Sequence, residues 1–297
     1  MFEKVLFPTD LGELSSHLLT CISDLRNIGL EEAILLYVIN VDEINHNLLA
    51  SFRDRDEARL REIARIRLEE QIQVLRNRGI QTKAIIATGI PSNEIVRISE
   101  SEGVSLIIGG ARRHHGKQED ELDTTTTRVI YKSNLPVLVI KLSDEEIKHP
   151  NECDRFCSRL FSKVLFPTDW SDCAKATLNQ LIELRKIIGQ LVVSHVMDER
   201  ILRHLEPEKI EEYRQHDLNR LHEIKEILSR QGFSANTHLH VGYPPFEISR
   251  IADEEDISLM AIGKIGRTGL KEIIWGSISQ HLVRLSPCSV LVYYCCD

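Results

Sequence analysis

The strongest constraint on the fold of this chain is a long internal repeat. Residues 2–10, FEKVLFPTD, recur as residues 161–169, FSKVLFPTD, and differ at a single position. Later landmarks return in the same order and at a constant offset, such as Gly89-Ile90-Pro91 against Gly242-Tyr243-Pro244. Solenoid repeats span only about 20 to 50 residues, so a repeat that fills half the chain is a duplicated domain. The chain should therefore fold as two similar domains.

Each copy alternates short runs of β-branched and apolar residues with longer segments of helical period. This alternation is typical of βαβ units, which build a parallel sheet covered by helices. We predict five strands and four helices in each copy. The strands are expected at residues 3–8, 33–39, 82–87, 104–109 and 135–141 of the first copy, and at residues 162–167, 190–196, 235–241, 257–262 and 288–294 of the second.

The domain boundaries follow from the ends of the two copies. The first copy occupies residues 1–142 and the second residues 161–297. The segment between them, residues 143–160, is polar and charged and contains Pro150. This composition is typical of a linker. We therefore predict two α/β domains that are joined by a short connecting segment.

Composition excludes several classes of function. A chain of 297 residues, 42% of them hydrophobic and 28% charged, has enough apolar side chains for two separate cores. The formal net charge of -8 argues against non-specific binding to nucleic acid or to an anionic membrane, because both attract basic surfaces. No apolar run approaches the roughly 20 residues that span a bilayer. We expect a cytoplasmic protein with neither nucleic acid nor membrane as a partner.

Cysteines and histidines offer weaker signals. The seven cysteines include no C-x-x-C pair, and a chain of this size does not need disulfides to hold its core. We expect reduced thiols, although Cys153 and Cys157 would lie one helical turn apart. His238 and His240 alternate along an expected strand, so a metal ion shared between them is an alternative interpretation. No third ligand stands nearby in the sequence, and we predict no metal site there.

The residues that carry chemistry lie at the ends of strands in the second copy. Ligands of open doubly wound sheets bind beyond the carboxyl ends of the strands. Asp169 ends the first strand, and Gly263 follows the fourth and opens the pattern G-x2-G-x9-G-S, which continues through Gly266 to Gly276 and Ser277. Glycines let backbone N–H groups approach phosphate oxygens, and a helix N-terminus adds partial positive charge. The pattern predicts a nucleotide site; the alternative is that these glycines only form a tight loop.

This spacing, with Pro-Thr-Asp after the first strand, resembles the ATP-binding type of universal stress protein over nearly the whole of both copies. The resemblance implies an α/β fold of two tandem doubly wound five-stranded parallel sheets, each with strand order 3-2-1-4-5, similar to the adenine nucleotide alpha hydrolases. It also implies ATP, or ADP or AMP, as the ligand, with Mg²⁺ held through the phosphates. The nucleotide-binding residues implied are Pro167, Thr168, Asp169, Val196, Ile262, Gly263, Lys264, Gly266, Arg267, Gly276, Ser277, Ile278 and Ser279.

The first copy keeps the strand-end Asp10 but departs from this pattern at the decisive positions. Arg113 stands where the second copy has Gly266, and Asp123 stands where it has Gly276. We expect the Arg113 side chain to project into the phosphate path and Asp123 to repel phosphate. The alternative, in which Arg113 neutralises a phosphate, stays open. The first copy is therefore predicted to have a degenerate nucleotide site.

The resemblance implies a role in stress response or regulation, through nucleotide-dependent conformation and binding to a partner. The P-loop pattern G-x4-G-K-[ST] is absent and no residue stands out as a catalytic base. Two alternatives remain: a slow Mg²⁺-dependent ATPase or phosphotransferase, and a structural or interaction protein without a ligand. The resemblance further implies that the fifth strands, near residues 137–140 and 290–293, pair the domains into an intramolecular pseudo-dimer, with a homodimer left open.

Overall fold

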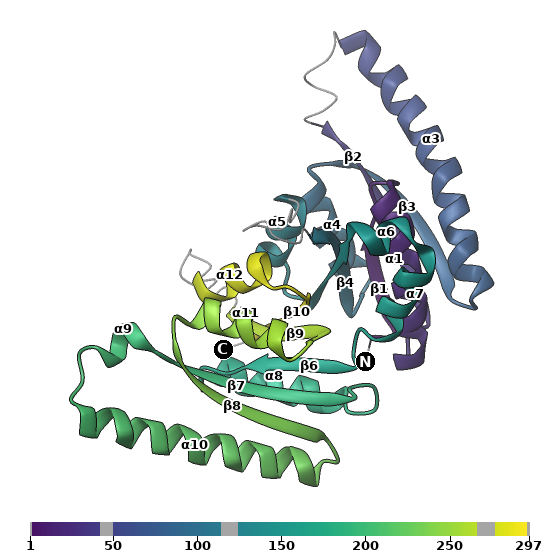
Figure 1. The fold of residues 1–297 in the computed structure, drawn as a ribbon. Coiled ribbons are helices and arrows are strands. Elements are labelled where there is room, and N and C mark those ends of the chain that lie inside the picture. Colours follow the sequence, from purple (N-terminus) through teal and green to yellow (C-terminus); the bar gives the residue numbers. More distant parts are fainter. Residues whose placement is uncertain (1, 42–49, 114–123, 266–276, 296–297) are drawn as a thin grey trace. The chain divides into compact units, whose positions relative to one another are not determined.

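The computed structural model describes residues 2–41, 50–113, 124–265 and 277–295 (Figure 1). Within these ranges the chain divides into two compact units. The first unit ends at Ser158 and the second begins at Arg159. Each unit holds one copy of the repeat, so the duplication in the sequence is a duplication in the fold.

The first unit contains a five-stranded parallel sheet in the order β3-β2-β1-β4-β5. This is the strand order that the family resemblance implies. Strands β2, β3 and β4 extend past the carboxyl ends that the apolar runs predict, because their pairing with the neighbouring strand continues there. Strand β5 has the predicted length but begins two residues later, and β1 begins one residue later. Their bounds are β1 Lys4–Pro8, β2 Glu32–Asn40, β3 Gln81–Gly89, β4 Leu106–Arg113 and β5 Val137–Ser143.

Helices cover both faces of this sheet, as the βαβ pattern predicts. Helices α1 and α3 contact each other, and α4 contacts α5, in agreement with one pair of helices on each face. The bounds are α1 Glu13–Asp24, the 3-10 helix η1 Leu25–Ile28, α3 Ala50–Asn77, α4 Pro91–Ser101, α5 Thr124–Lys132, α6 Asp144–Lys148 and α7 Pro150–Ser158.

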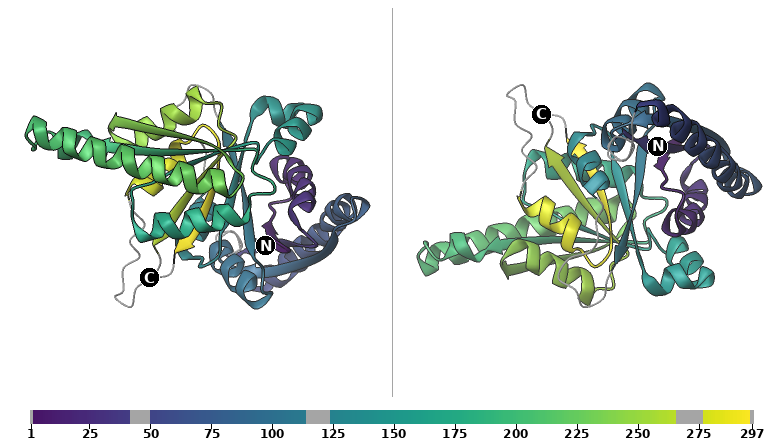
Figure 2. Two further views of the ribbon diagram at one scale, coloured as in Figure 1. Left: turned by 90° about the horizontal axis from the view of Figure 1, so that it is seen from below. Right: turned by 90° about the horizontal axis from the view of Figure 1, so that it is seen from above.

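The second unit repeats this architecture. Its parallel sheet has the order β8-β7-β6-β9-β10, and α10 lies along β8 and β7, as Figure 2 shows from two further sides. The strands are β6 Lys163–Pro167, β7 Gln190–Asp198, β8 Ser234–Gly242, β9 Leu259–Ile265 and β10 Ser289–Cys295. The helices are α8 Asp172–Glu183, α9 Glu199–Leu202, α10 Pro207–Arg230, α11 Pro244–Glu254 and α12 Ser277–Leu285.

The central strand of each sheet is paired unequally with its two neighbours. In the second unit, β6 pairs with β7 from Lys163 to Pro167 but with β9 only at Val164 and Leu165. The first unit shows the same pattern, with β4 partners only at Val5 and Leu6. The strands therefore separate towards their carboxyl ends, where the winding of the sheet reverses and where ligands of such folds bind.

The connecting segment differs from the expected linker. Residues 143–160 are largely helical, in α6 and α7, and α7 packs on α1 within the first unit. Ser143 accepts a hydrogen bond from the backbone N–H of Glu146, and the Glu146 carboxylate accepts one from the backbone N–H of Ser143. This capping box makes a helix out of a segment whose charge suggests a loop.

The expectation of reduced cysteines is wrong for four of them. Cys21 of α1 is joined to Cys157 of α7, and Cys173 of α8 is joined to Cys295 of β10. The paired residues are 136 and 122 positions apart in the sequence. No local spacing marks such pairs, because the fold alone brings their helices and strands together.

Within the described ranges, no helix is both long and apolar enough to cross a membrane. This agrees with the absence of long apolar runs in the sequence.

Candidate functional site

A cavity of about 650 Å³ opens at the carboxyl ends of the strands in the second unit. It lies where β6 separates from β9, as the doubly wound topology requires. Most of the residues predicted from the sequence line it, namely Pro167, Thr168, Asp169, Val196, Ile262, Gly263, Lys264, Ile278 and Ser279. Gly266, Arg267 and Gly276 lie outside the described residues, and of Ser277 only its place as the first residue of α12 is described.

A tight turn after β6 presents Asp169 at the mouth of the cavity. The Thr168 hydroxyl accepts a hydrogen bond from the backbone N–H of Trp170 at 3.1 Å, and Asp169 Oδ1 accepts one from the N–H of Ser171 at 3.0 Å. Trp170 has a φ of 66°, which non-glycine residues rarely adopt. The carboxylate of Asp169 is exposed and keeps acceptor capacity for a ligand.

The first unit builds the same turn from the same residue types. Thr9 Oγ1 accepts from the N–H of Leu11 at 3.0 Å, and Asp10 Oδ1 accepts from the N–H of Gly12 at 2.8 Å. Leu11 has a φ of 61°, close to that of Trp170. The repeated Pro-Thr-Asp therefore encodes a turn as well as an acidic residue. In the first unit Asp10 also accepts a hydrogen bond from Ser15 Oγ at 2.6 Å.

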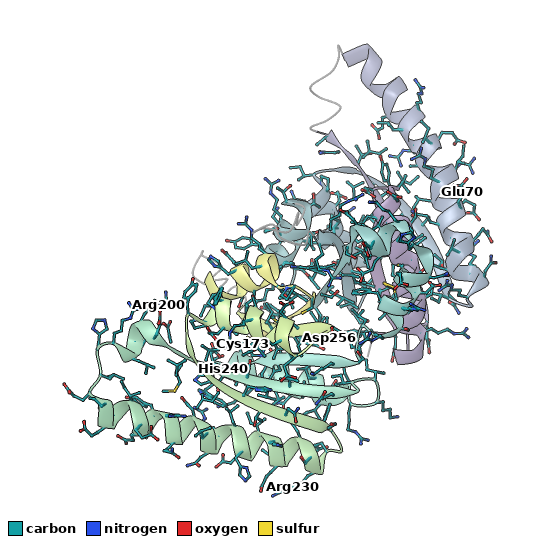
Figure 3. All side chains as sticks on the ribbon, viewed as in Figure 1. Glu70, Cys173, Arg200, Arg230, His240 and Asp256 are labelled. Carbon is teal, nitrogen blue, oxygen red and sulfur yellow. A yellow bond between two sulfur atoms is a disulfide. The ribbon has the colours of Figure 1, made fainter. Side chains whose placement is uncertain are left out.

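Gly263 lies where β9 passes closest to α8. A Cβ atom on this residue would lie 2.5 Å from Cys173 Sγ and 2.6 Å from Thr177 Oγ1. Cys173, labelled in Figure 3, is fixed by its disulfide to Cys295, so it has little freedom to withdraw. On the other side, the Ser279 hydroxyl of α12 donates to the carbonyl oxygen of Gly263 at 3.4 Å. A glycine is required here by close packing, in addition to any approach of a ligand.

Lys264 is a β-strand residue and not part of a loop. The prediction ended the fourth strand at residue 262, whereas β9 continues to Ile265 because its backbone pairs with β10 as far as Cys295. Lys264 is almost fully buried, and burial lowers the pKa of its ammonium group to about 8. Its Nζ lies 5.8 Å from the ring centroid of Tyr294. Since Lys264 also lines the cavity, an anionic group bound there would meet this lysine and would favour its protonated form.

Sequence reasoning missed His195 and Asp217, which also line the cavity. His195 Nδ1 lies 2.7 Å from the carbonyl oxygen of Thr168, so this nitrogen donates, and Nε2 lies 3.4 Å from Asp217 Oδ2. The ring of Trp170 stands 4.8 Å from the His195 ring. A histidine beside Val196 at a strand end was a usable signal. Asp217 gave none, because an acidic residue in the middle of α10 is typical of a solvated helix face.

An apolar wall of the cavity was also missed. It is formed by the segment after β7 and by the start of α10, through Ile201, Leu202, Leu205 and Tyr213. At the end of β7, Asp198 Oδ1 accepts from Arg200 Nε at 2.9 Å, and the Arg200 guanidinium lies 4.9 Å from the ring centroid of Tyr243. Arg200 is labelled beside α9 in Figure 3. Hydrogen bonding to Arg200 lowers the pKa of the Asp198 carboxyl.

The first unit has a cavity of about 560 Å³ in the equivalent place, lined among others by Asp10, Gly110 and Thr126. The expectation that Arg113 projects into the phosphate path is wrong. Arg113 Nη2 lies 3.1 Å from Glu146 Oε1, and both side chains are half-buried. Glu146 belongs to α6, a helix in the segment that the sequence predicts to be a linker. Asp123 lies outside the described residues.

His238 and His240 are each paired with a charged side chain of the second unit. His238 Nε2 lies 3.2 Å from Glu255 Oε1, and His240 Nδ1 lies 3.1 Å from Arg250 Nη2. Burial, and then the charge of Arg250, lower the pKa of His240. Over the described part of the chain, the one group of three or more closely placed potential ligands is elsewhere, in the first unit.

Comparison with known proteins decides the family. A family model described as "Universal stress protein family" matches residues 1–141 and again residues 160–293. The chain belongs to the universal stress protein family. The two matches coincide with the two units, so this universal stress protein is a tandem form.

Individual relatives agree with this assignment. The universal stress protein MJ0577 of Methanocaldococcus jannaschii is 36% identical over 155 residues, which are 48% of this chain and 96% of the relative. The universal stress protein YxiE of Bacillus subtilis is 31% identical over 146 residues, 45% of this chain and 99% of the relative. A crystal structure of a universal stress protein from Archaeoglobus fulgidus DSM 4304 covers 99% of both chains at 26% identity, with a TM-score of 0.75. Relatives of one domain thus match half of this tandem protein, and a longer relative matches all of it.

Gly263→Ala is expected to destabilise the second unit by about 1 to 3 kcal/mol, the usual cost of overpacking. The added methyl group would meet a disulfide sulfur and Thr177, and neither can move away easily. Gly110→Ala is the matched control, because its methyl group would meet the tip of the Leu18 side chain, which can rotate. Urea unfolding of both variants measures the difference. Equal losses would contradict the packing role given to Gly263.

Lys264→Met is expected to change how stability depends on pH. Between about pH 8 and pH 10 the unfolded chain holds a proton on Lys264 that the folded chain has released. The free energy of unfolding of the parent protein should therefore rise with pH across this window, by about 2 kcal/mol from this group. The methionine variant should lack that contribution. Denaturant titrations of both proteins at pH 8 and at pH 10 measure it, and parallel changes would refute the assignment.

Proposed function

We propose that the second unit of this universal stress protein binds ATP, or the related ADP or AMP, and that Mg²⁺ accompanies it through the phosphates. The observation that carries the proposal is the cavity at the strand ends, which gathers Asp169, Val196, Gly263 and Ser279 from four separate elements. Its volume of about 650 Å³ is in the range of small-molecule and cofactor sites.

The residues present fit an adenine nucleotide. The exposed Asp169 carboxylate would accept hydrogen bonds from ribose hydroxyls, as an acidic residue does in other nucleotide folds. Val196 and Ile262 offer apolar surface for the base, and the segment after β7 extends that surface. The phosphates would lie near Gly263 and the N-terminus of α12, where backbone N–H groups and the helix dipole favour negative charge.

The first unit is proposed not to bind ATP. It lacks the glycines that correspond to Gly266 and Gly276. Arg113 is paired with Glu146, so its charge is already neutralised and is not offered to a phosphate. Asp10, the counterpart of Asp169, is engaged by both Gly12 and Ser15. We propose that this unit serves the protein as a partner for the binding unit, and that the two pair through β5 and β10 as the family resemblance implies.

Binding, and not hydrolysis, is the proposed activity. The His195–Asp217 pair is the observation that favours the alternative, a slow ATPase, because such a pair can move a proton. Both ring nitrogens of His195 nevertheless face protein groups, one the carbonyl of Thr168 and the other Asp217. The proposed role is therefore a stress-response or regulatory one, in which the nucleotide changes the conformation that a protein partner meets.

Calorimetric titration of the full chain with MgATP is expected to give one site per chain. Asp169→Ala should weaken binding by roughly 10- to 100-fold, the cost of losing hydrogen bonds to a charged acceptor. Asp10→Ala, the matched change in the first unit, should leave the affinity unchanged. Two equivalent sites in the parent protein, or equal losses in the two variants, would contradict the proposal.

Gly266→Arg copies into the second unit the residue that the first copy carries at this position. We expect this variant to fold as the parent protein does and to lose measurable MgATP binding, because the side chain would occupy the phosphate path. Circular dichroism checks the fold, and the same titration checks binding. Unchanged affinity would show that the glycine pattern does not hold the phosphates.

Release of phosphate by the parent protein, followed over hours and compared with His195→Ala, separates binding from slow hydrolysis.

A further inference from the structure

Three cysteines of the first unit converge between α1 and α7. Cys21 lies on α1, and Cys153 and Cys157 lie one turn apart on α7, so both can face the same neighbour. The three sulfur atoms all lie within 4.8 Å of one another, and the residues are 1%, 1% and 4% exposed. Across the residues that the structure describes, this is the one group of three or more potential metal ligands.

The cluster contains one thiol more than a disulfide needs. Cys21 and Cys157 are joined, while Cys153 Sγ lies 3.9 Å from Cys157 Sγ and donates to the carbonyl oxygen of His17 at 3.6 Å. Two thiolates bound to one tetrahedral zinc ion, each at about 2.3 Å, lie about 3.8 Å apart. The separation of Cys153 and Cys157 already matches that spacing. Cys21 faces both of them from the opposite helix.

We propose that the reduced cluster of Cys21, Cys153 and Cys157 binds a thiophilic metal ion of the zinc class. Buried thiols in apolar surroundings resist ionisation unless a cation compensates the thiolate charge, and soft sulfur ligands select such ions. Binding of Zn²⁺ to three thiols forms three Zn–S bonds and releases three protons. The fourth position of the ion is left for solvent or for an added ligand, as in zinc sites with three protein ligands.

Metal binding and the disulfide exclude each other. The bond between Cys21 and Cys157 removes two of the three ligands. A phosphine restores them as thiols by supplying two electrons and becoming the phosphine oxide, while water supplies the oxygen of the oxide and the two protons. Either state ties α7 to α1. Since α7 ends at Ser158 and the second unit begins at Arg159, the cluster anchors the chain directly before the point where the units join.

The test uses the full-length chain, stripped of metal by a chelator and reduced with a phosphine under anaerobic conditions. Zn²⁺ is titrated in competition with a chromophoric chelator. We expect one tightly held equivalent in the parent protein, and a loss of affinity of at least roughly 100-fold in Cys153→Ser, which keeps the Cys21–Cys157 pair. Cys288→Ser is the matched control, because Cys288 is also a buried cysteine outside the disulfides but lies in the second unit. It should bind Zn²⁺ as the parent protein does.

A second measurement does not depend on the folding of the variants. The parent protein is loaded with Co²⁺, and the intensity of its thiolate-to-metal charge-transfer absorption is compared before and after oxidation. We expect strong absorption in the reduced protein and none after Cys21 and Cys157 are joined, with the bond located by mass spectrometry of alkylated peptides. Failure of the reduced parent protein to bind Zn²⁺ or Co²⁺ would overturn the proposal. So would equal binding by Cys153→Ser, or binding that survives the disulfide.

Discussion

The unequal pairing of the central strand is the feature on which the rest of each unit depends. β6 keeps its hydrogen bonds to β7 along its whole length but loses those to β9 after Leu165. The strand ends therefore open a gap at the place where the chain changes its winding direction. The turn with Asp169, the glycine of β9 and the start of α12 all come to this gap because of the strand order. The cavity is a consequence of topology before it is a consequence of any single side chain.

The same topology in the first unit shows how much of a site can be lost while the fold stays. β1 has the same two-residue pairing with β4, and the Thr9-Asp10 turn has the same backbone geometry. What differs is the surroundings of the gap. Arg113 pairs with Glu146 of α6, so a helix that follows the sheet holds the side chain at the position that corresponds to Gly266 of the second copy. Scaffold and chemistry can therefore diverge independently after a duplication.

The cysteines show a second kind of dependence on tertiary structure. Both disulfides and the three-sulfur cluster join elements that are more than 100 residues apart in sequence. One disulfide lies against Gly263 at the edge of the strand-end cavity, and the cluster lies between α1 and α7, where the first unit ends. Cysteine sulfur atoms thus lie next to the candidate site in the second unit. In the first unit they lie close to the end of that unit in the sequence.

The sequence by itself determined the duplication, the ten strands, their order through the family resemblance, and nine of the residues that line the cavity. It could do so because strand periodicity, turn residues and glycine spacing are local patterns. Such patterns favour the same backbone structure largely independently of the rest of the chain. Only the tertiary structure decided that Lys264 is buried, that His195 meets Asp217, that Arg113 pairs with Glu146 and that Cys21 meets Cys157. Each of these depends on which distant element packs against the residue, and that information lies in the folded arrangement of the chain and not in any short stretch of it.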